Sequence, residues 1–409
     1  MLIFATLTIG VAAGLAGMSL ALLLHYIQHI AYGYSPTHII SNETFLEGVR
    51  SSSSARRVIV LSICGLIAGL GWWAVYRYGK PLVGIEEAIK SKKPHMPIPT
   101  TSAHILLQII TIALGSPLGR EVAPRELATL FAGWLAVKTG LSLKDTQIMM
   151  ACAAGAGLAA VYNVPFGGAL FTLEALLFTL QWSALLPALT TSVIATVVAW
   201  IGLGNEPMYH VPDYTISSSL VVWSIFASPI FGIGGYWFKR MATTARRKAP
   251  SNWHLPILCL LNFIMIGLLA IYLPALLGNG KSPAQLEFDD ATGIGITAAL
   301  LILRTFIVWS SFRAGARGGL LTPSLANGAL LGVLLGTLWN IIWPSSSLGA
   351  FAIIGAAAFL AAAQKMPLVA IVLIFELTRI NFNFLIPVLF AVTGAVGVCN
   401  LYKKNEIIE

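Results

Sequence analysis

Residues 115–126, GSPLGREVAPRE, place two arginines and two glutamates beside glycine and proline in a mostly apolar chain. Ionisable side chains inside membrane segments are costly and usually functional. A glycine and proline break directly before a helix leaves backbone N–H groups free, at the positive end of the helix dipole. Such a helix start binds anions through the backbone alone. The chemistry indicated by this stretch is therefore anion binding.

Glu121 is the sharpest candidate in this stretch. A carboxylate at a helix start competes with an anion for the same N–H groups. We therefore expect Glu121 to act as a tethered plug that leaves when it is protonated. The alternative is a loop salt bridge with Arg120 or Arg125.

A second break of the same kind, GGLLTP at residues 318–323, points to an internal repeat. Three anchors recur in the same order at offsets of 199 to 202 residues: Gly119 and Pro124 with Gly318 and Pro323; Leu158, Pro165 and Glu174 with Leu360, Pro367 and Glu376; and Gly79, Lys80 and Pro81 with Gly280, Lys281 and Pro283. We expect each glycine or proline cluster to precede a helix directly. Repeats of this kind are typical of transporters, which bind substrate between the halves. The alternative is that these residues only kink packed helices.

Composition makes this an integral membrane protein, because 57% of its residues are hydrophobic and 10% charged, against roughly 25% charged in soluble domains. Seven apolar runs are near spanning length: 2–24, 58–76, 183–203, 217–238, 255–277, 291–310 and 383–400. The net charge of +9 is concentrated in short segments such as Lys239 to Lys248. We interpret this segment as a cytoplasmic loop and expect no nucleic-acid partner.

The predicted organisation is all-α and polytopic. We expect an N-terminal helix and loop at 1–56, a first repeat at 57–204, a connecting helix and basic loop at 205–252, a second repeat at 253–400 and a short tail at 401–409. Several helices are too short to be full crossings, so the sequence leaves parallel and inverted repeats open.

At these residues the chain resembles the CLC family of chloride channels and proton-coupled chloride exchangers. Gly119-Arg120-Glu121 resembles the family's gate motif, and residues 318–323 resemble its second-half loop. The resemblance implies an inverted repeat of tilted and broken helices, a homodimer, and a path lined by Gly79, Lys80, Arg120, Leu320, Leu321 and Gly319. It also implies that Glu121 is the gate and proton carrier.

The chain departs from the family pattern at several positions. Lys80 stands where the family has an anion-binding serine, and it either adds positive charge to the path or points to the cytoplasm. Ala175 stands where exchangers usually keep an inner proton glutamate, which disfavours the usual proton route. Tyr402 is the candidate for the pore tyrosine, and Leu321 replaces a phenylalanine whose backbone N–H is the coordinating group.

The leading hypothesis is transport of a small inorganic anion, most often chloride in this family, by a channel or a proton-coupled exchanger. A fluoride/proton antiporter of the same family is the alternative. An enzyme using Glu121 and Arg120 and a transporter of cations or organic solutes are less favoured, since no nucleophile and base pair is evident and the path is basic. We expect no cofactor and no metal, with His25 and His29 at the membrane interface, and a plasma-membrane location. Glu174 and Glu376 suggest helix-end structure rather than ion chemistry.

Overall fold

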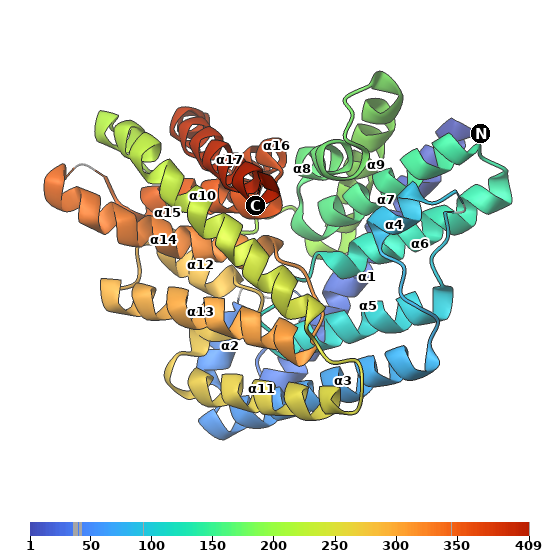
Figure 1. The fold of residues 1–409 in the computed structure, drawn as a ribbon, viewed down its shortest axis with the longest axis horizontal. Coiled ribbons are helices and arrows are strands. Elements are labelled where there is room, and N and C mark those ends of the chain that lie inside the picture. The colour runs from blue at the N-terminus through green and yellow to red at the C-terminus, as the bar shows by residue number, and fades with distance from the viewer. Residues whose placement is uncertain (36–39, 41–42, 93, 345, 409) are drawn as a thin grey trace.

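The computed structural model describes residues 1–35, 40, 43–92, 94–344 and 346–408, and these form helices joined by short connections (Figure 1). The helices up to residue 203 are α1 (Leu2–Tyr32), α2 (Phe45–Ser51), α3 (Ser54–Tyr78), α4 (Ile85–Lys90), α5 (Ile98–Ala113), α6 (Val122–Thr139), α7 (Leu143–Tyr162), α8 (Pro165–Leu170), the π-helix η1 (Phe171–Leu177) and α9 (Trp182–Leu203). Those that follow are α10 (Ser218–Arg247), α11 (His254–Tyr272), η2 (Pro274–Leu276), α12 (Lys281–Phe288), α13 (Ile294–Ala314), α14 (Leu321–Ile342), α15 (Leu348–Gln364), α16 (Pro367–Thr378), η3 (Phe382–Phe384) and α17 (Leu385–Ile408).

Eight segments among the described residues are long and apolar enough to cross a membrane. Seven of them contain or overlap the apolar runs expected from the sequence, and the eighth is α14. The sequence predicts a helix after residues 318–323 but no apolar run of spanning length there, because glycines and a polar first turn interrupt the hydrophobic pattern. The run predicted to reach residue 277 instead ends at Tyr272, where Pro274 begins a short 3₁₀ turn.

The helices of the two halves pack in equivalent pairs. α6 packs on α7 as α14 packs on α15, and α8 contacts α9 and α16. α1 packs against α5, α6, α7 and α9, and α10 packs against the equivalent helices α13, α14, α15 and α17. α10 was expected to be a connecting helix, but its neighbours repeat those of α1. Figure 1 shows most second-half helices on the left and most first-half helices on the right.

The two halves are inverted relative to one another, and α3 and α11 show this directly. These equivalent helices pack face to face, with Gly69 against Pro256 and Gly267 against Val58. Residue numbers increase along α3 in the direction in which they decrease along α11, so the two helices run antiparallel. Because both are long enough to span the membrane, the halves enter it from opposite sides. Glycine at these positions lets the backbones approach closely, as is typical between membrane helices.

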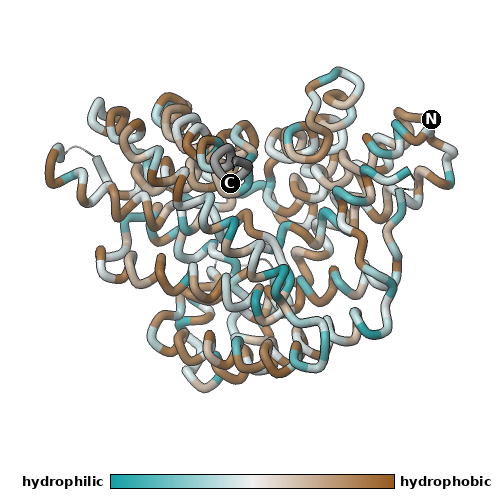
Figure 2. The backbone as a smooth tube through the Cα atoms, in the orientation of Figure 1, coloured by the Kyte–Doolittle hydropathy of each residue, from teal (hydrophilic) through white to brown (hydrophobic). Residues whose placement is uncertain are grey.

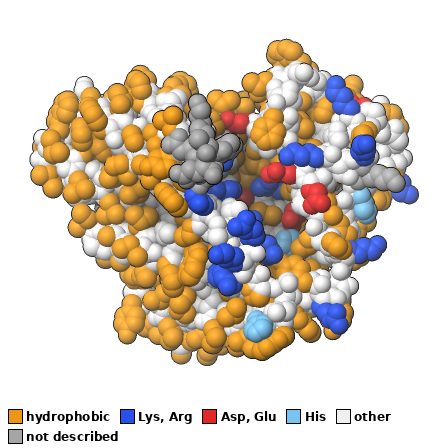
Figure 3. Space-filling model, in the orientation of Figure 1, with side chains coloured by type: hydrophobic (Ala, Val, Ile, Leu, Met, Phe, Trp, Pro, Cys, Tyr) orange, Lys and Arg blue, Asp and Glu red, His pale blue; other side chains and the backbone are white. Residues whose placement is uncertain are grey.

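The basic cluster between the halves is helical and not a loop. Lys239, Arg240, Arg246 and Arg247 lie in the last turns of α10, and the helix ends at Arg247. Figure 2 shows hydrophilic residues in the middle of this face, and Figure 3 shows Lys and Arg side chains there, with hydrophobic side chains along the rim. The side chains of Lys403 and Lys404, in the predicted tail at 401–409, lie outside the described residues.

The third anchor pair differs between the halves. Gly280 directly precedes α12, with φ of 113°. Gly79 instead ends α3, and the next helix, α4, begins only at Ile85. The expectation that a helix follows each anchor directly is therefore wrong at Gly79. Pro81 follows Lys80 and disfavours helical backbone at that residue.

Candidate functional site

The two glycine loops meet at the centre of the molecule. Gly119 and Gly319 exchange two backbone hydrogen bonds, of 2.9 Å from Gly119 N–H to the Gly319 carbonyl and 2.8 Å in the other direction. This antiparallel bridge is isolated from any named strand among the described residues. The bridge fixes the starts of α6 and α14 beside each other. The sequence predicted both loops but not that they bind each other.

Each of these helices begins in the same way. The third helical residue is Pro124 in α6 and Pro323 in α14. Proline is tolerated in a first turn because its missing N–H has no partner within the helix there. The remaining free N–H groups belong to the residues just before each proline. Two helix starts with positive dipole ends therefore face a shared space between the halves.

Glu121 occupies this space. The residue precedes α6, but its side chain makes no capping bond to its own helix. Its Oε1 accepts a hydrogen bond of 2.8 Å from the backbone N–H of Leu321, the first residue of α14. Glu121 is only 2% exposed. The carboxylate thus binds the other half's helix start, a position whose free N–H groups suit an anion.

Glycine is required on both sides of this carboxylate. A side-chain carbon added at Gly119 would collide with Oε2 of Glu121, and one added at Gly319 would collide with Oε1. Gly318 has no room either, because such a carbon would lie 2.6 Å from the Cβ of Leu118. These residues therefore let the backbone approach the charged group closely.

Tyr162 completes the contacts of Glu121, and sequence reasoning missed it. It is the last residue of α7, and its hydroxyl donates to Glu121 Oε2 at 3.2 Å and lies 2.9 Å from the hydroxyl of Thr322. The repeat contained a signal for it. At the same offset as the other anchors, Tyr162 aligns with Gln364, the last residue of α15, which donates to Ser324 at 3.2 Å. Both helix ends therefore place a polar side chain at the first turn of α14.

Arginines surround the site without binding the carboxylate. Arg120 stands over the Tyr162 ring at 5.4 Å, and Arg125 stands over Phe171 at 4.1 Å. The Nε atoms of both are buried and have no hydrogen-bond partner among the described groups. Arg246, at the end of α10, donates to the carbonyl of Gly318 at 2.9 Å. The salt bridge expected as the alternative for Glu121 is not among the ion pairs of the described residues.

A fully buried arginine supports the first loop. Arg304 of α13 is 0% exposed, and donates to the carbonyls of Leu276 at 3.0 Å and Pro117 at 3.5 Å. A buried charge is tolerated when hydrogen bonds satisfy it. Arg304 was not among the predicted residues, although an arginine inside the apolar run 291–310 is a signal that could have found it.

Two predicted path residues lie elsewhere. Lys80 is exposed at the end of α3, and its backbone N–H donates to the hydroxyl of Thr100 at 3.0 Å. Tyr402 is 40% exposed near the end of α17, with its ring 5.7 Å from that of Tyr236. No described contact joins either side chain to Glu121. By contrast, Leu320 and Leu321 are buried beside the bridge.

Glu174 and Glu376 form a reciprocal pair of helix caps. Glu376, on α16, accepts from the N–H groups of Phe166 and Gly167 at 2.9 and 2.7 Å, at the start of α8. Glu174, on η1, accepts from Leu368 and Val369 at 3.1 and 2.8 Å, at the start of α16. Each half therefore caps a helix of the other half. This agrees with the expected structural role.

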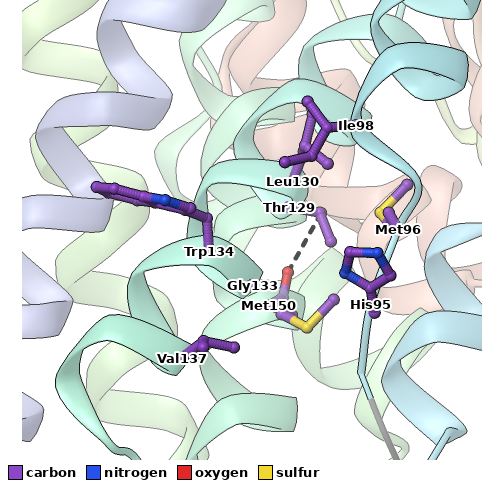
Figure 4. Close-up of a pocket in the computed structure, with 9 residues that line it drawn as sticks. All are labelled: His95, Met96, Ile98, Thr129, Leu130, Gly133, Trp134, Val137 and Met150. Carbon is purple, nitrogen blue, oxygen red and sulfur yellow. Dashed lines mark hydrogen bonds between the residues drawn. The ribbon is translucent and has the colours of Figure 1, made fainter.

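A separate pocket of about 170 Å³ lies along α6 (Figure 4). Its polar side chains are His95 and Thr129, and Thr129 donates to the carbonyl of Met150 at 3.3 Å. The other lining residues are apolar or glycine: Met96, Ile98, Leu130, Gly133, Trp134, Val137 and Met150. With no arginine, lysine or carboxylate in its lining, this pocket is not the anion site.

Comparisons with known proteins identify the family of this chain. The family model for the voltage gated chloride channel matches residues 64–400. The chain is 26% identical to the voltage-gated ClC-type chloride channel ClcB of Citrobacter koseri, over 86% of each chain. It is 25% identical to the H(+)/Cl(-) exchange transporter ClcA of Vibrio cholerae, over 99% of this chain and 87% of that one.

Solved structures share the fold. A slow cyanobacterial Cl⁻/H⁺ antiporter superposes with a TM-score of 0.81 at 19% identity, over 98% of this chain and 94% of that one. A CLC-type fluoride/proton antiporter superposes with a TM-score of 0.70 at 20% identity, over 98% of this chain and 95% of that one.

Inverted repeats whose helix starts meet at a buried carboxylate are those of a membrane transport protein. More specifically, this chain belongs to the voltage-gated chloride channel, or CLC, family, as a multi-pass membrane protein.

Proposed function

We propose that the protein moves chloride across the membrane through the site between α6 and α14, with Glu121 as its gate. The observation that carries this proposal is the hydrogen bond from Leu321 N–H to the Glu121 carboxylate. A group that accepts from a free helix N-terminus holds the position of an anion. A protonated Glu121 is neutral, so the positive end of the α14 dipole no longer stabilises its carboxyl group at the helix start. A chloride ion then takes its place.

The charges around the gate favour an anion over a cation. Positive charge from Arg125 and Arg246 acts on Glu121. Arg120, the residue directly before Glu121, interacts electrostatically with His25 and Lys281. Lys281, the first residue of α12, is the repeat counterpart of Lys80, which lies exposed at the end of α3. Basic groups along a path attract anions and raise the barrier to cations.

We infer that transport is coupled to protons, with Glu121 carrying the proton. Similar proteins are named as a H(+)/Cl(-) exchange transporter and a fluoride/proton antiporter. A carboxyl group that alternates between a hydrogen-bonded anion and a neutral acid links anion entry to proton binding. Lys80, exposed at the end of α3, is proposed to draw anions toward the inner mouth, and Tyr162 to take the place expected for Tyr402.

The proposed setting is a homodimer in the plasma membrane, with no cofactor and no enzymatic activity. The reciprocal caps at α8 and α16 are hydrogen bonds that join the two halves. Phe166 and Leu368 beside these caps are exposed apolar residues. A second copy or lipid would cover them.

Anion efflux from proteoliposomes tests the proposal. Vesicles loaded with chloride and carrying the purified protein should release chloride faster than empty vesicles once the membrane potential is clamped. Release of fluoride in preference to chloride would support the fluoride/proton alternative. Release of neither anion above the empty vesicles would refute the proposed function.

A further inference from the structure

A second buried carboxyl group lies close to the gate on the same helix. Glu126 is five residues beyond Glu121 on α6 and is 8% exposed. Five residues of α-helix rise about 7.5 Å along the helix axis, so the two residues lie within two turns of each other. Glu126 is not part of the bridge between Gly119 and Gly319.

Two side chains of α5 contact this carboxyl group. The amide of Gln108 donates from Nε2 to Glu126 Oε2 at 3.0 Å. His104 places its Nε2 atom 3.8 Å from Glu126 Oε1. Both side chains are buried, with Gln108 at 0% and His104 at 7% exposure. The carboxylate form of Glu126 therefore has two donor groups facing it.

Trp72 of α3 fixes which nitrogen of His104 carries the proton. Its indole N–H donates to His104 Nδ1 at 2.9 Å. Since Nδ1 accepts this bond, the neutral ring carries its proton on Nε2, the atom that faces Glu126. A proton added at Nδ1 would break the bond to Trp72. His104 is therefore held as a neutral donor, which positions Glu126 and does not itself take up the proton.

The acid form of Glu126 also finds a partner here. The Oε1 atom of Gln108 is buried and has no hydrogen-bond partner among the described groups. A buried carbonyl oxygen without a donor is costly. A protonated Glu126 can donate to this atom while it accepts from Gln108 Nε2. The site thus satisfies the carboxyl group in both of its protonation states.

We propose that Glu126 is a second proton-binding carboxyl group, positioned by Gln108 and His104, which passes protons to Glu121. This rests on the proposed function. A proton from water on the side of the α10 end bonds to the Glu126 carboxylate. The Glu126 O–H bond then breaks, the proton crosses through water, and an O–H bond forms on Glu121. Glu121 becomes neutral and releases Leu321 N–H to the anion.

The charged groups facing this site come from several elements. Arg125, next to Glu126 on α6, acts on the charges of both Glu126 and Glu121. Arg317, before the second glycine loop, and Arg246, at the end of α10, act on His104. These positive charges disfavour a protonated, positive His104. Among Glu126, Gln108 and His104, the Glu126 carboxyl group is therefore the one that binds the proton.

The test measures proton and chloride movement together in proteoliposomes, for wild type, E126Q, E126D and the control E287Q. In E126Q we expect chloride-driven proton movement to fall at least about tenfold and chloride flux to fall less, so that the ratio of protons to chloride drops. E126D keeps a carboxyl group and should retain proton movement. Glu287 is a matched control, because it is 1% exposed and accepts bonds from Thr292 at 2.8 Å and Thr297 at 3.1 Å. E287Q should keep the wild-type ratio of protons to chloride.

Each other outcome counts against the proposal. A wild-type ratio in E126Q, or chloride transport without protons in the wild-type protein, overturns it and leaves the proposed function standing. Absence of anion flux in the wild-type protein overturns both. If E126Q does not fold, Q108L tests the same site. Losing the amide should then change the proton-to-chloride ratio about threefold or more, and an unchanged ratio overturns the proposal.

Discussion

The carboxylate of Glu121 accepts a hydrogen bond of 2.8 Å from the backbone N–H of Leu321, 200 residues away in the sequence. Glu121 leads into α6, whereas Leu321 is the first residue of α14. A carboxylate of one half therefore occupies the helix start of the other half. The relationship needs both glycine loops, since the mutual bonds of Gly119 and Gly319 set the two helix starts side by side.

Replacing the gate tests whether its charge matters. The variant E121Q keeps the shape of the side chain but cannot alternate between a charged and a neutral form. We expect chloride flux that no longer changes with pH, and proton movement reduced at least about tenfold. The measurement is chloride and proton flux from proteoliposomes across pH 4 to 8. A pH profile matching that of the wild type would count against the gate.

The hydroxyl of Tyr162 should help to hold the gate closed. The variant Y162F removes its bonds to Glu121 and Thr322 and leaves the ring under Arg120. One such bond contributes about 0.5–1.5 kcal/mol, equivalent to about one pH unit or less. Because the lost donor favoured the carboxylate, half-maximal chloride flux should move to higher pH. An unchanged midpoint, or a shift to lower pH, would contradict this role.

The space at Gly319 should tolerate no side chain. In G319A the added carbon meets the Glu121 carboxylate, so either the gate or the loop must move. Overpacking of this kind costs about 1–3 kcal/mol, and we expect a lower melting temperature in detergent and altered pH dependence of flux. The matched control is G295A in α13, where an added carbon has nothing within 4 Å. Equal behaviour of the two variants would show that the close approach is unimportant.

The reciprocal caps should act on stability and not on transport. The variant E376Q weakens two charge-assisted bonds at the start of α8. Hydrogen bonds to charged groups contribute about 1.5–3 kcal/mol, so its melting temperature should fall by several degrees, as should that of E174Q. Chloride flux per folded molecule should remain that of the wild type. E206Q, at an exposed glutamate, is the control. If E376Q lost chloride flux while its melting temperature stayed unchanged, Glu376 would act in ion transport and not in helix capping.

The sequence predicted those features that depend on local pattern. Glycine, proline and charge in residues 115–126 singled out Glu121, which is buried and accepts from the start of α14. The fixed offset between anchors predicted the repeat, and the symmetric Glu174 and Glu376 were correctly interpreted as helix-end residues. Their partners were not predictable, because each glutamate caps a helix far away in the sequence.

Features set by long-range packing were missed for the same reason. Tyr162 ends a helix of small residues, and nothing nearby in the sequence shows that Glu121 and Thr322 lie against its hydroxyl. The equivalence of α1 and α10 has no sequence anchor and is visible only in their neighbours. Lys80 was placed by counting residues back from Glu121, which gives no information on where the end of α3 lies.

The most direct measurement of the central claim is a crystal structure of the E121A variant grown in bromide, with anomalous diffraction to locate the ion. Removing the carboxylate frees the N–H of Leu321 while leaving the Gly119–Gly319 bridge intact. The account predicts a bromide peak within hydrogen-bonding distance of the Leu321 nitrogen. Bromide bound elsewhere, with no peak at the start of α14, would contradict it.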